Sequence, residues 1–245
     1  MGFFIKKLPA ILLSFTAQCC CTGALAQNNE LGSWDILALN VNLKKNWTVY
    51  AETQTRSQKL ATDFYYHELK AGLQYNIPKK GSLFFGMGDY KTYAYPGNYK
   101  SPATTKESRI WEQLILINNI DRIKIEHRYR IEQRWVNGEF SNRFRYRINP
   151  IVPINHQTVV AKTLYATAFD EVFFTNEAPF FLRNRVFAGA GYQFSKLFAL
   201  QGGFIRQYDY RKSDDGSGKN FLQLLMLFTI DKTQTKMERH PSTMD

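Results

Sequence analysis

The stretch DRIKIEHRYRIEQRWVNGEFSNRFRYRI, residues 121–148, decides the fold of this chain. Two runs of alternating charged and apolar residues flank Asn137-Gly138, a dipeptide that favours the two-residue turn of a β-hairpin. The turn sets the register of the hairpin, because it places Val136 opposite Glu139. One face of the hairpin then pairs aromatic and branched residues: Trp135 with Phe140, Ile131 with Phe144, and Tyr129 with Tyr146.

The opposite face of this hairpin is a ladder of charges. The same register pairs Glu132 with Arg143, Arg130 with Arg145, and Arg128 with Arg147. Eight cations fall on this face: Arg122, Lys124, Arg128, Arg130, Arg134, Arg143, Arg145 and Arg147. Only Glu126 and Glu132 oppose them there. Directly opposed like charges destabilise a strand pair, so the ladder predicts acidic partners from other strands, such as Glu52 or Glu68, or a bound anion.

Two-residue alternation continues along most of the chain, so we expect an all-β protein. Eleven segments fit strands: 33–43, 46–56, 63–76, 82–94, 108–118, 121–135, 140–150, 157–171, 184–194, 198–210 and 220–230. Single-chain bacterial barrels normally have an even number of antiparallel strands. We therefore expect one antiparallel barrel of ten or twelve strands, with twelve favoured.

The connections between these segments alternate in length. Residues 44–46, 77–81, 118–119 and 195–196 are short, whereas RSQKLAT (56–62), AYPGNYKSPATTKE (94–107), FFTNEAPFF (173–181) and RKSDDGSGK (211–219) are longer. Outer-membrane barrels have short periplasmic turns and longer external loops. A soluble β-meander could show the same alternation.

The first residues have the three parts of a secretory signal. Lys6 and Lys7 precede the apolar run LPAILLSFTA and the small-residue site Ala24-Leu25-Ala26. We expect residues 1–26 to be a cleaved signal peptide, 27–232 to be the barrel, and 233–245 to be a polar mobile tail. Cleavage would remove all three cysteines together with Lys6 and Lys7, and would lower the net charge from +11 to +9.

Three features favour a transmembrane barrel over a soluble one. The segments reach the 9 to 11 residues that a tilted membrane strand needs, and the last one, NFLQLLMLFTI, resembles a C-terminal assembly signal. Aromatic residues near strand ends predict interfacial girdles: Trp34, Trp47, Tyr75, Tyr93, Trp135 and Phe194. We expect location in the outer membrane, an arginine-rich polar lumen, and membrane lipid and the barrel-assembly machinery as partners.

The chain also resembles the bacterial outer-membrane proteins of the domain of unknown function 2490 family. The resemblance rests on WDILALNVNLKKNWTVYAETQTRSQ (34–58), YYHELKAGLQY (65–75), EHRYRIEQRW (126–135) with NRFRYRI (142–148), and ATAFDEVFF (166–174). It implies a barrel over nearly the whole mature chain. Because the family has no established activity, it implies no catalytic or binding residue.

No motif in the sequence predicts catalysis, a metal site or a cofactor. The histidines, His67, His127, His156 and His240, lie outside any nucleophile or metal motif. Adjacent Asp170 and Glu171 point to opposite faces of a strand, and solvation is the simplest expectation for both. Nucleic acid is not expected as a partner, because export and a lumenal location separate the basic groups from it.

Three functions remain open at this stage. The chain could form a narrow porin-like channel that favours small anionic solutes, since rings of arginine or lysine favour anions. It could equally be a structural or surface-interaction barrel whose lumen is plugged by salt bridges. A soluble periplasmic ligand-binding barrel is the third alternative.

Overall fold

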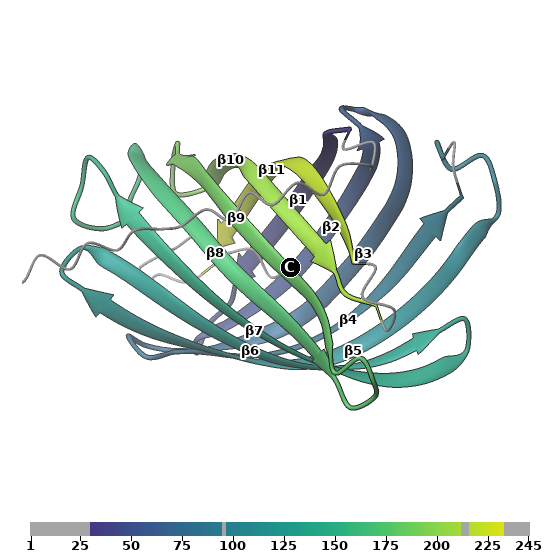
Figure 1. Cartoon of the computed structure of the whole chain (residues 1–245). Helices are drawn as coiled ribbons and strands as arrows, with labels where there is room; N and C mark the ends of the chain where they lie inside the picture. The colour runs from purple at the N-terminus through teal and green to yellow at the C-terminus, as the bar shows by residue number, and fades with distance from the viewer. Residues whose placement is uncertain (1–29, 95–96, 212–215, 233–245) are drawn as a thin grey trace, which may run out of the picture.

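The described residues, 30–94, 97–211 and 216–232, form a closed β-barrel in the computed structural model of the chain (Figure 1). The barrel has eleven strands within these ranges: β1 (Gly32–Asn42), β2 (Trp47–Lys59), β3 (Thr62–Ile77), β4 (Gly81–Tyr93), β5 (Ala103–Ile120), β6 (Ile123–Val136), β7 (Glu139–Pro153), β8 (Thr163–Thr175), β9 (Phe181–Gln193), β10 (Phe198–Asp209) and β11 (Ser217–Asp231). The predicted signal peptide (1–26) and tail (233–245) lie outside the described residues.

A parallel strand pair closes the barrel. Each strand pairs antiparallel with its neighbour in the sequence, but β1 and β11 run in the same direction, with Gly32 beside Phe221 and Asn42 beside Asp231. An all-antiparallel ring must contain an even number of strands, whereas one parallel pair requires an odd number. The expectation of ten or twelve strands is therefore wrong for the described residues, and the eleven segments recognised in the sequence correspond to the eleven strands.

The barrel has two mouths, which the strand order defines. Mouth A holds the connections that follow β2, β4, β6, β8 and β10, and mouth B holds those that follow β1, β3, β5, β7 and β9. The predicted long connection at 56–62 shrinks to residues 60–61, because β2 and β3 extend through it. The connection at mouth B between β7 and β8, residues 154–162, is longer than predicted, because β8 begins only at Thr163.

The hairpin of β6 and β7 has the predicted register. Val136 pairs with Glu139, and the ladder continues without a shift to Lys124 and Ile151. Asn137 and Gly138 have φ angles of 50° and 93°. Both angles lie in the left-handed region that a two-residue turn with Asn-Gly requires, so this dipeptide fixes which residues enter the lumen.

The outward face of the strands is largely apolar. Leu69, Leu83 and Met87 are 63%, 51% and 55% exposed, and their neighbours in sequence face inward, as the alternation along a strand requires. Polar pairs interrupt this face. Gln133 Nε2 donates to Glu112 Oε2 at 3.3 Å, and Asn184 Nδ2 donates to Asp170 Oδ1 at 2.5 Å. His127 contacts the hydroxyl of Tyr146, and Lys91 pairs with Asp89. No helix in the described ranges is long and apolar enough to cross a membrane.

Aromatic side chains gather at both ends of the outward face. At mouth B the ring centroids of Trp47 and Tyr75 are 5.0 Å apart, and at mouth A those of Trp135 and Phe140 are 5.4 Å apart. Further aromatic contacts join Tyr192, Phe194, Phe198 and Phe228 at mouth B, and Phe174, Phe181 and Tyr210 at mouth A. Trp34 is not part of such a girdle. It faces the lumen and is 0% exposed.

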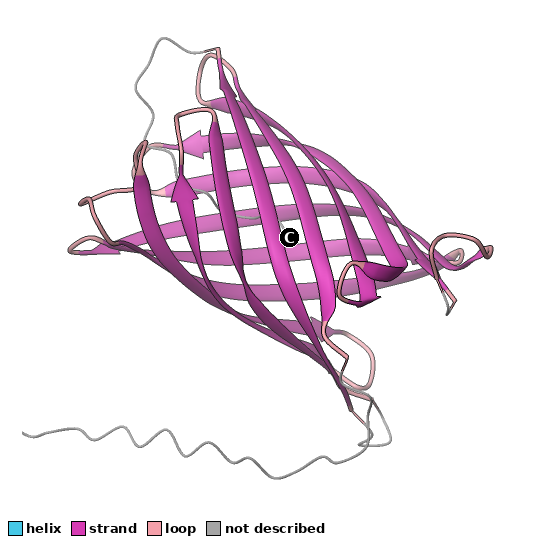
Figure 2. Cartoon of the chain, turned by 90° about the horizontal axis from the view of Figure 1, so that it is seen from above, coloured by secondary structure: helices cyan, strands magenta, loops and turns pink. Residues whose placement is uncertain are grey.

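The inward face divides into two walls with different chemistry. Most buried charges come from β2, β3 and β5 to β7, together with Glu171 of β8, and form the charged wall: Glu52, Gln54, Arg56, Glu68, Lys70, Glu107, Gln113, Lys124, Glu126, Arg128, Arg130, Glu132, Arg143, Arg145, Arg147 and Glu171. The buried rings of Tyr50, Phe84, Tyr90 and Trp111 lie on the strands of this side as well. The apolar wall comes from β8 to β11 and β1: Trp34, Ile36, Ala38, Tyr165, Phe169, Phe173, Phe187, Ala199, Ile205, Phe221, Leu225 and Leu227. Figure 2 shows that the strands of the barrel wall are strongly tilted.

Candidate functional site

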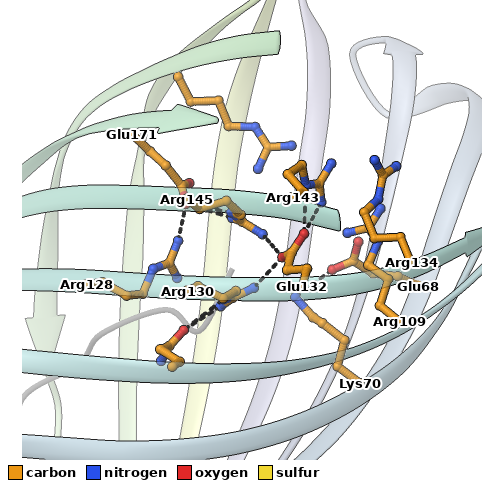
Figure 3. A network of polar contacts seen from close by, with 12 residues as sticks. Glu68, Lys70, Arg109, Arg128, Arg130, Glu132, Arg134, Arg143, Arg145 and Glu171 are labelled. Carbon is orange, nitrogen blue, oxygen red and sulfur yellow. Dashed lines mark hydrogen bonds and ion pairs between the residues drawn. The ribbon is translucent and has the colours of Figure 1, made fainter. Parts of the chain in front are cut away.

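Glu132 on β6 is the centre of the charged wall (Figure 3). Its carboxylate accepts a hydrogen bond from Arg143 Nε at 2.7 Å and another from Arg145 NH1 at 2.7 Å. Arg130 NH1 lies 3.3 Å from the same carboxylate. The side chain of Glu132 is 0% exposed, so one buried carboxylate is shared by three guanidinium groups.

Glu171 on β8 is the second carboxylate that the arginines share. Its Oε1 lies 2.8 Å from Arg145 Nε and also pairs with Arg128 NH2. Arg147 is its direct cross-strand neighbour. Arg145 thus bridges Glu132 and Glu171, and links β6, β7 and β8 through one chain of charge-assisted hydrogen bonds, which are stronger than neutral ones.

A neutral amide completes the contacts of Arg130. Gln113 on β5 accepts hydrogen bonds from Arg130 Nε at 2.9 Å and from Arg130 NH2 at 2.7 Å. The opposition of Arg130 and Arg145 across the hairpin is therefore compensated from both sides, by Gln113 and by the two glutamates. This is the compensation that two facing arginines require.

A separate cluster lies on β2 and β3. Lys70 Nζ lies 2.6 Å from Glu68 Oε1 and also pairs with Glu52. Glu68 lies 3.8 Å from Arg56 NH2, and Glu52 accepts a hydrogen bond from the hydroxyl of Tyr50. Glu52 and Glu68 lie in the lumen as predicted. They pair with Lys70 of their own hairpin, whereas the prediction paired them with the arginines of β6 and β7.

The guanidinium groups of the charged wall lie against the rings of the apolar wall. Arg145 Cζ is 4.5 Å from the centroid of Phe173, and Arg147 Cζ is 5.0 Å from that of Phe169. Arg185 of β9, a cation on the apolar wall itself, lies between two rings, with its Cζ 4.9 Å from the centroid of Trp34 and 4.8 Å from that of Phe173. A cation over an aromatic face is attracted by the ring quadrupole, so the two walls interlock.

This interlocking buries the side chains in the middle of the lumen. Arg128 and Arg130 from the charged wall are each 2% exposed, and Phe173 and Phe187 from the apolar wall are 0% and 1% exposed. A lumen that was continuous with water would leave these inward side chains accessible. One cavity of ≈870 Å³ lies at mouth A, and one of ≈220 Å³ lies at mouth B.

The family comparison agrees with this architecture over most of the chain. Residues 31–217 match the model of a family described as a protein of unknown function, DUF2490. The chain belongs to the DUF2490 family. No curated protein and no solved structure matches it. The match extends from the start of β1 to the first residue of β11 and includes both carboxylates that the arginines share, Glu132 and Glu171.

In this DUF2490 member most of the predicted ladder enters the lumen. Lys124, Glu126, Arg128, Arg130, Glu132, Arg143, Arg145 and Arg147 are all buried. Lys124 pairs with Glu126, whose carboxylate also accepts a bond from Asn149 at 3.4 Å. Arg134 is only half-buried and lines the mouth A cavity. Arg122 is not in the lumen wall: the turn after β5 takes it to mouth B, where it is exposed.

Glu171 is one of the lumenal residues that the sequence did not predict, together with Lys70, Gln113 and Arg185. It was expected to be solvated like Asp170, yet it is 0% exposed. Its lumenal role depends on Arg128 and Arg145, which reach it from β6 and β7. Two features of the sequence could have indicated it. Glu171 has the same alternation as the inward-facing residues of β8, and the lumen has more arginines than the predicted acids can pair with. In the described residues no group of three or more His, Cys, Asp or Glu is placed to hold a metal ion.

Proposed function

We propose that this chain is an outer-membrane barrel whose lumen is closed by its own side chains, and that it acts through its surface and mouths. The observation that carries the proposal is the apolar outward belt between two aromatic groups, wrapped around a charged and closed interior. Outer-membrane barrels combine an apolar band, aromatic girdles and a polar interior. The N-terminal signal-like sequence supports export by the same route.

A soluble barrel turns its apolar face inward and its polar face to water. This barrel does the reverse: Val49, Leu73 and Phe85 pair across β2, β3 and β4 on its outward face and are 41%, 42% and 48% exposed. Soluble monomers rarely expose a continuous apolar patch of more than a few hundred Å². The outward belt therefore favours lipid as its solvent.

Membrane fractionation of cells that express the full chain tests the location. We expect the protein to stay with outer membranes through a carbonate wash, and to migrate differently on gels before and after boiling. Extraction without detergent, together with identical migration of the boiled and unboiled forms, would contradict the proposal.

A matched pair of substitutions sharpens the test. Leu73→Arg places a charge in the belt, whereas Leu197→Arg places it in the mouth B connection, where Leu197 is already 59% exposed. A charge near the bilayer midplane costs about 2–4 kcal/mol and one near the interface about 0–1 kcal/mol. Only L73R should reduce insertion into lipid vesicles. Equal insertion of both variants would favour a soluble barrel.

An anion-selective channel is the second candidate function. The cationic side chains at mouth A favour it, because fixed positive charge attracts anions. The interlocked walls argue against it, because Glu132 and Phe173, which would line such a channel, are each 0% exposed. Conductance across a bilayer distinguishes the two functions.

A further inference from the structure

The mouth A cavity has its own charge balance, distinct from that of the closed lumen. Among the described residues that line it, seven are cationic and three are acidic. The cations come from strands far apart in sequence, including Arg56 on β2, Arg134 on β6 and Lys219 on β11. A cavity of ≈870 Å³ with this surplus of positive charge is large enough for a small organic anion.

The acids of the cavity are already shared. Glu107 forms a two-point contact with Arg109, at 2.6 Å and 2.8 Å, and also pairs with Arg134. Asp209 pairs with Arg183. Arg143 uses Glu132, which lies deeper in the lumen. The carboxylates therefore fix the direction of the guanidinium groups while the surplus of positive charge remains.

Lys219 shows this surplus most directly. In the described part of the chain its ammonium contacts the side-chain oxygen of Gln58 and the rings of Tyr65 and Phe221, all of which are neutral. It also lines the same cavity as Arg56. A partly buried cation with neutral partners is stabilised when an anion binds beside it.

Aromatic side chains form another part of the cavity lining. Tyr65 and Tyr66 both line the cavity, with ring centroids 6.4 Å apart. Lys219 Nζ lies 4.1 Å from the ring centroid of Tyr65. The cavity thus offers ring surface next to its cations, which suits a ligand that carries both an apolar part and an anionic group.

We infer that the mouth A cavity binds a small organic phosphate, whose phosphoryl oxygens contact Arg134 and Lys219 and whose organic part lies against Tyr65. A phosphate monoester carries about two negative charges and three acceptor oxygens, so it can contact several cations at once. Guanidinium groups match phosphate geometry through paired hydrogen bonds. The inference goes beyond the closed-barrel proposal and does not depend on membrane insertion.

Isothermal titration of the full chain in detergent micelles tests this site, with phenyl phosphate as the probe. We expect saturable binding of one phenyl phosphate per barrel. The double variant K219Q/R134Q should weaken it by about tenfold or more, since both charge-assisted hydrogen bonds to the phosphoryl group are lost. Neither substitution leaves a carboxylate without a cationic partner, because Glu107 still pairs with Arg109 when Arg134 is replaced. The single variant K219Q gives the same test with less disturbance.

Arg122→Gln is the matched control, because it removes the same charge at the opposite mouth. It should change the affinity by less than about twofold, as expected for an exposed charge far from the ligand. Absence of saturable binding, or equal weakening by R122Q and K219Q, would overturn the inference. If inorganic phosphate binds as tightly as phenyl phosphate, the inferred contact of the organic group with Tyr65 is wrong. If phenylacetate binds as tightly, the inferred preference for phosphate over carboxylate is wrong.

Discussion

The charged wall and the apolar wall fill the same lumen in opposite ways. On the charged wall, Glu132 and Glu171 are each shared by several arginines, so each position depends on its partners. On the apolar wall, large rings fit over small residues, as Tyr165 does beside Gly191. The first wall is specified by charge pairing and the second by volume. The comparison predicts different responses to substitution.

Breaking the charged wall should give the largest effect. Glu132→Gln keeps the volume of the side chain but removes the charge that Arg130, Arg143 and Arg145 share. Removing one partner of a buried ion pair costs about 3–5 kcal/mol. We expect a decrease of that size in the free energy of unfolding, measured by reversible urea titration in lipid vesicles with tryptophan fluorescence.

The control for this prediction is a carboxylate outside the strands. Glu177→Gln removes an exposed charge in the mouth A connection after β8, and should change the free energy of unfolding by less than about 0.5 kcal/mol. A loss of less than 1 kcal/mol in E132Q, on the order of the control, would mean that the shared carboxylate does not organise the charged wall.

Overfilling the apolar wall should have the next largest effect. A side chain at Gly191 would overlap the hydroxyl and ring of Tyr165, and overpacking costs about 1–3 kcal/mol. Gly191→Leu should lower the free energy of unfolding by that amount in the same titration. Gly202→Ala is its control, because the nearest atom to a new Cβ there is Gln223 O at 3.7 Å. Equal stability of the two variants would show that the wall is loosely packed.

A volume change within the apolar wall should be milder still. Phe187 is 1% exposed and stacks on Phe169 at 5.1 Å between centroids. Phe187→Leu keeps an apolar side chain of similar reach, and such changes usually cost less than about 1.5 kcal/mol. A loss of several kcal/mol in the unfolding titration would mean that the apolar wall is as demanding as the charged one.

The smallest effect is expected at mouth B. Arg122 was predicted to belong to the charged ladder, but it is exposed in the turn after β5. Arg122→Gln should therefore change the free energy of unfolding by no more than about 0.5 kcal/mol. Destabilisation close to that of E132Q would place Arg122 in the ladder after all.

The two walls also differ in how well the sequence predicts them. In the hairpin of β6 and β7, strict alternation and Asn137-Gly138 fix both the register and the lumenal face, and the structure confirms each predicted pair. In β11, apolar residues occupy both faces: Phe221 and Leu225 face the lumen while Leu222 and Leu224 face outward. Both environments are apolar, so residue type does not distinguish the two faces of β11. Only the spacing of Leu222, Leu224, Met226 and Phe228 indicates which residues share a face.

Two further features depend on topology that a single segment does not carry. Glu171 follows Asp170 in an otherwise apolar stretch, and its partners become evident only when β8 is placed beside β7. The strand number depends on how the first and last strands meet. A rule for antiparallel rings gave an even number, while the parallel pairing of β1 with β11 makes it odd.

Single-channel recording in a planar bilayer tests the closed lumen most directly. We predict that the full chain inserts without stepwise conductance, because the interlocked walls leave Arg130 and Phe173 only 2% and 0% exposed. Stable anion-selective steps from the wild-type chain, weakened when Arg130 and Arg145 are both replaced by Gln, would contradict the closed barrel and establish a channel.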